Sequence, residues 1–290
     1  MRSEDLAFVD GTGAIDLNVA WIHGSESAKH NTDPDIQVHA LDEHTYILRQ
    51  NMAVNFEAPF VFLLFGRSQA LLLDTGATAE PQFFPLRRTV DTVIDRWLAR
   101  HPHAGEYGLQ ILHTHSHHDH RAADAQFADR PSTVLVDAAR EPAWKYFGFD
   151  LDPEAVVALD LGGRIVDCFS TPGHDESAVT YYDRYTGLLF TGDTFYPGRL
   201  YVVDWSAFLR SIDRLMDWCS DHPVAFLLGC HIEMTTTPGV DYPSGATWQP
   251  EETSLELTVD HLRELQKTLS GYQGRRDRYS LPQLIVVPID

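Results

Sequence analysis

The stretch His113-Thr114-His115-Ser116-His117-His118-Asp119-His120 directly follows a strand-length apolar run, Leu109 to Leu112. It places five histidines and one aspartate within eight positions. Imidazole nitrogens and carboxylate oxygens are ligands of zinc and similar divalent ions. His115 and His117 stand two residues apart, so in an extended segment both side chains point to the same side. The adjacent Asp and His that end the stretch reach a neighbouring point where the chain bends. One short loop is therefore able to supply ligands to two metal ions.

A histidine-rich surface loop, or a set of satisfied core histidines, is the plain alternative. The rest of the chain argues against it, because polar residues follow three further apolar runs of strand length. His174, Asp193 and His231 each come shortly after such a run: residues 165–169, 188–190 and 224–228. A polar residue at the end of a buried strand lies at the edge of a sheet, where functional sites gather. Taken alone, each of these three is as well explained by a turn. Taken together, they complete the ligand shells of two metals.

With these residues in view, the chain resembles the metallo-β-lactamase superfamily of metallohydrolases. The family pattern is His-x-His-x-Asp-His, followed by a distant His, an Asp and a final His. In this chain the pattern is met by His115, His117, Asp119, His120, His174, Asp193 and His231. Leu72-Leu73-Asp74-Thr75-Gly76 also matches the family's early strand that ends in Asp-x-Gly. The resemblance covers roughly residues 36 to 235. It implies an α/β fold, a four-layer αββα sandwich with the metals at one edge of two sheets.

The resemblance also implies a ligand set. One metal would be held by His115, His117 and His174, the other by Asp119, His120 and His231, and Asp193 would bridge them. Two divalent ions are expected, zinc first, with iron or manganese as alternatives. Asp74 would orient a ligand or the bridging water; the alternative is a turn carboxylate that caps Thr75-Gly76.

The implied activity is a dinuclear metallohydrolase that uses a metal-bridging hydroxide on an ester, thioester, lactone or related small-molecule bond. Asp119 would be a ligand that also orients the hydroxide. Asp193 favours the glyoxalase II, lactonase and phosphodiesterase branches, because the β-lactamases proper carry Cys or Ser at that place. After His174 the chain reads Asp175-Glu176-Ser177 instead of the Thr-Pro-Gly-Ser of many glyoxalase II and lactonase members. The shape of the part of the site next to His174 is therefore left open.

Tyr196 is a second candidate catalytic residue, because a tyrosine polarises a substrate oxygen in similar lactonases; Tyr201 is its alternative. Arg199 would hold a substrate carboxylate. The competing interpretation is that Tyr196 and Tyr201 only pack the loop that follows Asp193. Cys230, beside His231, is expected to be a buried structural thiol, with a ligand or reactive thiol as the alternative. Residues 51–59 and 235–249, the latter with Trp248, are expected to cover the site from two sides.

Other functions of the same fold remain open. A mononuclear iron dioxygenase would leave Asp119 and His120 unused as ligands. A phosphodiesterase or a β-lactamase-like hydrolase would use both metals. A binding module with a relic site is disfavoured by the complete ligand set. Metal content separates these readings, since they require two zinc-like ions, one iron or none.

Bulk properties narrow the partners. The 290 residues carry a net charge of −20, so a nucleic acid backbone would be repelled and a small molecule is the expected substrate. No apolar run reaches the length of a membrane span, and the first residues lack a signal-peptide pattern. Three scattered cysteines favour a reducing compartment, and the cytoplasm is the expected location. A homo-oligomer is left open.

The expected organisation is an N-terminal extension over residues 1–35 and a metallo-β-lactamase-like domain over 36–290 with a C-terminal loop and helix. Periodicity predicts helices at 89–100, 122–128, 206–220 (capped by Ser206) and 255–269. It predicts strands at 36–41, 44–50, 60–65, 69–74, 109–112, 133–136, 165–169, 178–182, 188–190 and 224–228.

Overall fold

The computed structural model describes residues 6–289, and its strands form two six-stranded sheets. In the first sheet the strands follow in chain order: β1 (Ile36–Ala40), β2 (Thr45–Gln50), β3 (Phe60–Phe65), β4 (Gln69–Leu73), β5 (Gly108–Leu112) and β6 (Thr133–Leu135). The first four strands pair antiparallel, whereas β4, β5 and β6 pair in parallel. The parallel strands β4 and β5 therefore end at the same edge of this sheet.

The second sheet has the order β13 (Glu256–Leu257), β12 (Phe226–Gly229), β10 (Leu188–Gly192), β9 (Val179–Asp183), β8 (Ile165–Ser170) and β7 (Val157–Asp160). Within it β10 and β12 are parallel. A small third sheet pairs β11 (Arg199–Val202), β15 (Ile285–Pro288) and β14 (Tyr279–Ser280).

Alternation along the strands explains why the sheets stack. Phe60, Phe62 and Leu64 of β3 join the core between the two sheets, together with Val166 of β8 and Phe190 of β10. The intervening residues of β3 pack with the buried face of α1 (Leu86–Arg100) in a second core. Because successive strand residues point to opposite faces, an all-apolar strand must be covered on both sides.

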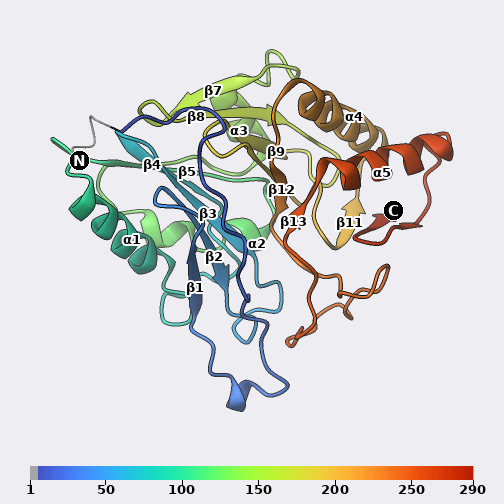
Figure 1. Cartoon of the computed structure of the whole chain (residues 1–290), viewed down its shortest axis with the longest axis horizontal. Coiled ribbons are helices and arrows are strands. Elements are labelled where there is room, and N and C mark those ends of the chain that lie inside the picture. Colours follow the sequence, from blue (N-terminus) through green and yellow to red (C-terminus); the bar gives the residue numbers. More distant parts are fainter. Residues whose placement is uncertain (1–5, 290) are drawn as a thin grey trace.

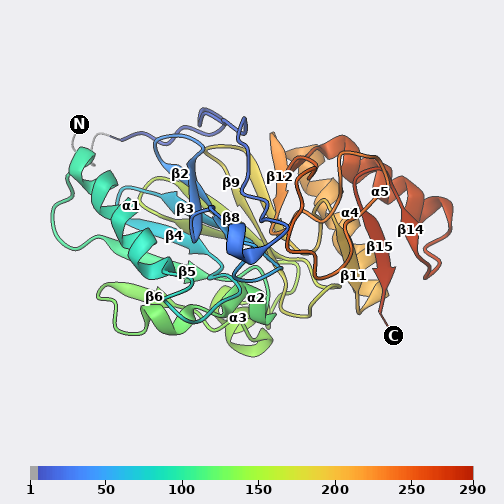
Figure 2. The same ribbon diagram turned by 90° about the horizontal axis from the view of Figure 1, so that it is seen from below.

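Two long helices, α4 (Trp205–Asp221) and α5 (Val259–Gly271), complete the outer layer. They share a third core with the outward residues of the second sheet, such as Phe169 and Leu189. Helix α1 lies at one side of the molecule and α4 and α5 at the other (Figures 1 and 2). The order helix, sheet, sheet, helix is the predicted four-layer αββα sandwich, which is confirmed.

Several local expectations need correction. Ser206 does not cap α4; the helix begins one residue earlier, and the Asp204 carboxylate accepts a hydrogen bond from the Ala207 amide at 2.9 Å. Leu255 and Leu257 do not belong to the last helix, because Leu257 lies in β13 and Thr258 caps α5. The predicted helix at 122–128 is a short α2 (His118–Arg121) followed by the 3-10 turn η3 (Asp124–Phe127). The sequence patterns also did not predict α3 (Arg140–Phe147), β7, β13 or the three strands of the third sheet.

The described N-terminal segment, residues 6–35, contains one short 3-10 helix, η2 (Ala28–His30). It runs along the molecule and is tied to it: Leu6 is buried beside α1, and Ile15, Leu17 and Trp21 pack against the core between the sheets. Residues 1–5, the start of the predicted extension, lie outside the described residues. Among the described residues, no helix combines the length and the apolar character needed to span a bilayer.

This architecture brings five chain segments to one edge of the two sheets. Asp74 follows β4 and His113 follows β5, while His174, Asp193 and His231 follow β8, β10 and β12. Each segment begins where its strand ends and the backbone hydrogen bonds of the sheet stop. Side chains of these segments can therefore turn toward one another at the sheet edge.

Candidate metal centre

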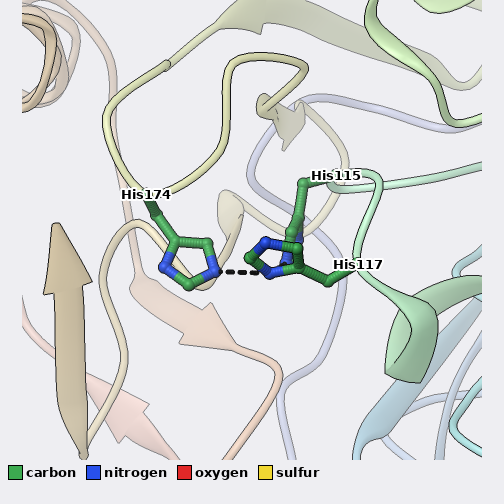
Figure 3. A group of neighbouring side chains, drawn as sticks. All are labelled: His115, His117 and His174. Atoms are coloured by element: carbon green, nitrogen blue, oxygen red, sulfur yellow. Dashed lines mark hydrogen bonds between the residues drawn. The ribbon is translucent and has the colours of Figure 1, made fainter. Parts of the chain in front are cut away.

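The first group of side chains consists of three histidines whose ring nitrogens converge (Figure 3). The Nδ1 atom of His117 lies 3.0 Å from Nε2 of His115 and 3.0 Å from Nε2 of His174. His115 and His174 are buried, whereas 46% of the His117 side chain is exposed. A neutral imidazole nitrogen is able either to donate or to accept one hydrogen, so hydrogen bonding alone cannot satisfy this triangle.

The second group contains two carboxylates and two histidines: Asp119, His120, Asp193 and His231. Asp119 Oδ2 lies 3.2 Å from Nε2 of His120 and 3.3 Å from Nε2 of His231. The two Nε2 atoms are 3.4 Å apart. Three of the four residues are buried, and Asp119 is the member that reaches solvent, with 23% of its side chain exposed.

Asp193 stands between the two groups. Its Oδ1 atom lies 3.5 Å from Nε2 of His231 and 3.6 Å from Nε2 of His120, while Oδ2 lies 3.7 Å from Nε2 of His174. Oδ1 is buried and has no hydrogen-bond partner among the described residues. A buried carboxylate oxygen without a donor is costly, unless a cation completes its surroundings.

The opposite ring nitrogens of three histidines are held from outside the groups. Nδ1 of His120 faces Asp74 Oδ2 at 2.9 Å. Nδ1 of His174 lies 2.7 Å from the carbonyl of Tyr201, and Nδ1 of His231 lies 2.9 Å from the carbonyl of Glu57. A ring that donates from Nδ1 to an oxygen keeps its Nε2 lone pair free for a metal.

His117 has the reverse orientation, because its Nδ1 faces the other histidines. Its Nε2 atom lies 3.6 Å from Oδ2 of Asp175. That carboxylate is fixed by Ser116 Oγ at 2.8 Å and by the amide and hydroxyl of Ser177 at 2.7 and 2.6 Å. The residue that breaks the expected sequence pattern after His174 therefore serves as the outer partner of His117.

Electrostatics in the two groups differ. Burial lowers the pKa of His115 well below its usual value, which favours the neutral, metal-binding ring. Burial acts to raise the pKa of Asp193, but the neighbouring imidazoles, His231 first, hold it well below its usual range. Burial acts to lower the pKa of His231, yet Asp193 and Asp119 raise it to about 10. Two carboxylates among imidazoles, the buried Asp193 and the partly exposed Asp119, thus favour positive charge in this group.

These residues fit two divalent cations. The first group offers three imidazoles and the second offers imidazoles with carboxylates, both common donor sets for zinc-like ions. The unsatisfied Oδ1 of Asp193 and the negative charge of the second group are the features that such cations would balance.

Comparison with known proteins agrees with this geometry. The model of the metallo-beta-lactamase superfamily matches residues 54–267, most of the chain. The chain belongs to the metallo-beta-lactamase superfamily. Its clusters of histidine and aspartate are consistent with bound divalent metals.

Curated members of the superfamily that resemble the chain are named hydroxyacylglutathione hydrolase. The Rhizobium meliloti protein is 32% identical over 136 residues, which cover 44% of this chain and 53% of that protein. The Pseudomonas paraeruginosa protein is 33% identical over 127 residues, covering 42% of this chain and 47% of that protein. The chain thus spans about half the length of these relatives.

Solved structures of the superfamily share the fold. A metallo-beta-lactamase from Pontibacter korlensis superposes with a TM-score of 0.52 at 15% identity and covers 80% of this chain and 99% of its own. The DIM-1 metallo-beta-lactamase gives 0.51 at 13% identity and covers 82% of this chain and 99% of its own. At these identities the similarity establishes the fold alone.

The predicted ligand residues are all brought together at this edge, and two other histidines of the loop are not. His113 faces the Val136 carbonyl and the Asp124 carboxylate with its two nitrogens, at 3.1 and 3.0 Å. His118 is exposed at the start of α2. Both lie outside the two groups, so the short stretch mixes ligand candidates with structural residues.

Tyr196 and Arg199 are engaged by neighbours. The Tyr196 hydroxyl lies 2.5 Å from the Arg199 carbonyl and 3.1 Å from the Glu233 carboxylate, and its one hydrogen is donated to one of these oxygens. Burial raises its pKa well above its usual value. The Arg199 guanidinium is paired with Glu233 at 2.6 Å and Asp241 at 2.8 Å. The catalytic role of Tyr196 stays a prediction, but these bonds favour a role in shaping the wall beside His231, whose ring is 5.7 Å away.

The sequence placed Glu57 only within the covering segment 51–59, and it indicated no contact of Glu57 or Asp175 with the ligand histidines. Glu57 contributes a backbone carbonyl, which any residue would supply, so no pattern signals it. Asp175 was visible as a departure from the family pattern next to His174. Its contact with His117, which lies on another loop, depends on how the two sheet edges meet.

Proposed function

We propose that the chain is a dinuclear metal-dependent hydrolase of ester-type acyl bonds, with thioesters as the first candidates. The placement of Asp193 carries this proposal, because its two oxygens face the two ligand groups separately. A single carboxylate in this position is suited to link two cations. Zinc is the proposed metal in both positions.

Support for a thioester comes from the relatives. Those with about 30% identity are named hydroxyacylglutathione hydrolase, and a hydroxyacylglutathione is a thioester. The family resemblance implies Cys or Ser at the position of Asp193 in β-lactamases proper, which also favours acyl esters over β-lactams. The partial coverage of these relatives keeps the choice of leaving thiol open.

Two divalent ions held here would supply Lewis acidity and make water more acidic near neutral pH. The chain's own part is to orient the reactants. Asp119 is the one member of the second group with appreciable solvent exposure, so its carboxylate is placed to hold the attacking water and accept its proton. The carbonyls of Glu57 and Tyr201 and the carboxylates of Asp74 and Asp175 keep the imidazoles aligned.

The test combines metal content with activity. Purified protein is analysed for bound metals and assayed on thioesters, lactones, β-lactams and phosphodiesters. We expect about two zinc-like ions per chain and the highest kcat/KM on thioesters. His115→Ala should lower bound metal and abolish turnover, whereas His118→Ala, in the same loop but outside both groups, should change neither. One iron per chain with no hydrolysis, or full activity of the metal-free protein, would refute the proposal.

A further inference from the structure

A small cavity of about 140 Å³ adjoins the proposed metal centre at His231. Its walls come from the segment before β3, from β11 with the residues after β12, and from the 243–249 loop. Since about 10–15 Å³ of such space is enough for one water, the cavity has room for a compact group of several heavy atoms. A substrate whose scissile bond lies at the metal centre has room here for one compact arm.

The charged side chains that line this cavity are predominantly acidic. Glu57 and Glu233 both line the cavity, and Arg199 is the one lysine or arginine among its described lining residues. Arg199 is already neutralised by Glu233 and Asp241 and also donates to the Tyr242 carbonyl at 2.6 Å. Holding a substrate carboxylate, as the sequence suggested, would require Arg199 to give up these bonds.

Glu57 supplies the one acidic side chain of the cavity lining, as described, that is not paired with Arg199. Its carboxylate has no hydrogen-bond or ion-pair partner among the described residues, although its backbone is fixed by Asn55 and His231. Phe56 and Tyr201 line the same cavity and add aromatic rings to the wall. A compartment that combines an unpaired carboxylate with aromatic rings matches the chemistry of alkylammonium recognition. Asp119 and Asp193 bring two further negative charges, which offset the charge of bound metals.

We propose that this cavity binds a cationic, alkylammonium-type arm of the acyl substrate, with Glu57 as the residue that selects the positive charge. This inference rests on the proposed hydrolase function and names its substrate class. It predicts a preference against anionic thiol arms, although the relatives are named for a glutathione thioester.

Three acetyl thioesters with arms of similar length test the inference. S-acetylthiocholine carries a trimethylammonium group, S-acetyl-3,3-dimethylbutanethiol is its neutral isostere, and S-acetyl-3-mercaptopropionate is anionic. In each case water cleaves the acyl–sulfur bond to give acetate and the free thiol, so one thiol assay serves all three. At low salt we expect kcat/KM for the cationic ester to exceed that for the anionic ester by about tenfold or more. The ratio should shrink as ionic strength rises.

Glu57→Gln keeps the size and backbone of the residue and removes the charge. We expect it to reduce the cationic-to-anionic ratio about fivefold or more, while Glu264→Gln, an equal charge change on the exposed surface of α5, leaves the ratio as in the wild type. Metal content is measured in each variant. Should Glu57→Gln fail to fold, Glu57→Ala is compared with Glu264→Ala in its place, because the net charge of −20 acts on the wild type and on both variants alike. A ratio in Glu57→Ala equal to that in Glu264→Ala overturns the inference. Hydrolysis of all three esters without charge preference overturns this inference alone, whereas hydrolysis of none overturns the proposed function as well.

Discussion

The Oδ2 atom of Asp74 lies 2.9 Å from Nδ1 of His120, and both side chains are fully buried. The same carboxylate accepts hydrogen bonds from the amide and hydroxyl of Thr114, at 2.7 and 2.8 Å, and from Cys230 Sγ at 3.3 Å. Asp74 has a φ of 67°, a left-handed conformation that Asp and Asn tolerate better than most residues. Asp74 is therefore more than a cap for the following turn, because it sets which nitrogen His120 presents to the centre.

Asp74→Asn tests this role with little change in shape or backbone preference. The amide would present hydrogens to donors that now face a carboxylate, so the His120 ring should lose its fixed orientation. We expect metal affinity in the second group to fall about 10- to 100-fold. Competition with a chromophoric chelator measures it. Unchanged affinity in a folded variant would show that Asp74 has only a structural role.

Asp175→Asn tests the outer partner of His117. The carboxylate lies 3.6 Å from Nε2, so its loss should weaken binding to the three-histidine group by about tenfold. A matched control is Glu176→Gln, the neighbouring carboxylate, which is 78% exposed and faces Arg140 instead. In cobalt-substituted protein, the visible spectrum should shift for Asp175→Asn and stay constant for Glu176→Gln. Equal effects of the two substitutions would indicate a general charge effect.

Removal of metal should destabilise the protein. A ligand that binds only the folded state at about 100 times its dissociation constant contributes roughly 2.7 kcal/mol. Excess EDTA should therefore lower Tm by on the order of 5 °C, and zinc should restore it. The Tm of a His115→Ala/Asp193→Ala variant should respond weakly to EDTA. If this variant showed the full EDTA response, the stabilising metal would have to lie elsewhere.

The sequence allowed the site to be assembled because its chemistry is concentrated in a few patterns. The histidine-rich loop after β5 and the single polar residues after β8, β10 and β12 are visible as strand-end signals. Buried strands such as β3 are equally visible, because six consecutive apolar residues must be covered on both faces. These signals are local, so they indicate which strands are covered on both faces and at which strand ends the site lies. The four-layer order was implied by the resemblance to the metallo-β-lactamase superfamily.

What could not be predicted depends on contacts between distant segments. Leu255 and Leu257 stand two residues apart, which is strand spacing, but they directly precede the helical pattern that starts at Val259 and were assigned to it. Pairing of Leu257 with Leu227 of β12 places them at the sheet edge. The region beside His231 keeps a negative charge because the Arg199 guanidinium is already paired with the carboxylates of Glu233 and Asp241. These two residues lie 34 and 42 positions further along the chain. Arg199, which the sequence offered as a partner for a substrate carboxylate, is therefore already paired. Glu57, which belongs to no sequence motif, has a carboxylate without a partner among the described residues.

The buried pair of Arg164 and Asp183 supports a final prediction, about stability. Nε and Nη2 of Arg164 bind the Asp183 carboxylate at 2.9 and 2.7 Å, and both side chains are fully buried. The guanidinium also donates to the carbonyls of His44 and Phe65 and to the Thr45 hydroxyl. It thus joins the first sheet to the β8–β9 part of the second.

Arg164→Met should lower the free energy of unfolding by about 3–5 kcal/mol, because it leaves Asp183 charged and buried without its partner. Arg263→Met is the matched control, since Arg263 pairs with Asp260 at the surface of α5, with side chains 57% and 85% exposed. That substitution should cost less than about 0.5 kcal/mol. Urea titration monitored by tryptophan fluorescence measures both. Adding Asp183→Asn to Arg164→Met should recover part of the loss, because the uncompensated charge is then removed; no recovery would mean that the lost bonds to His44, Phe65 and Thr45 dominate.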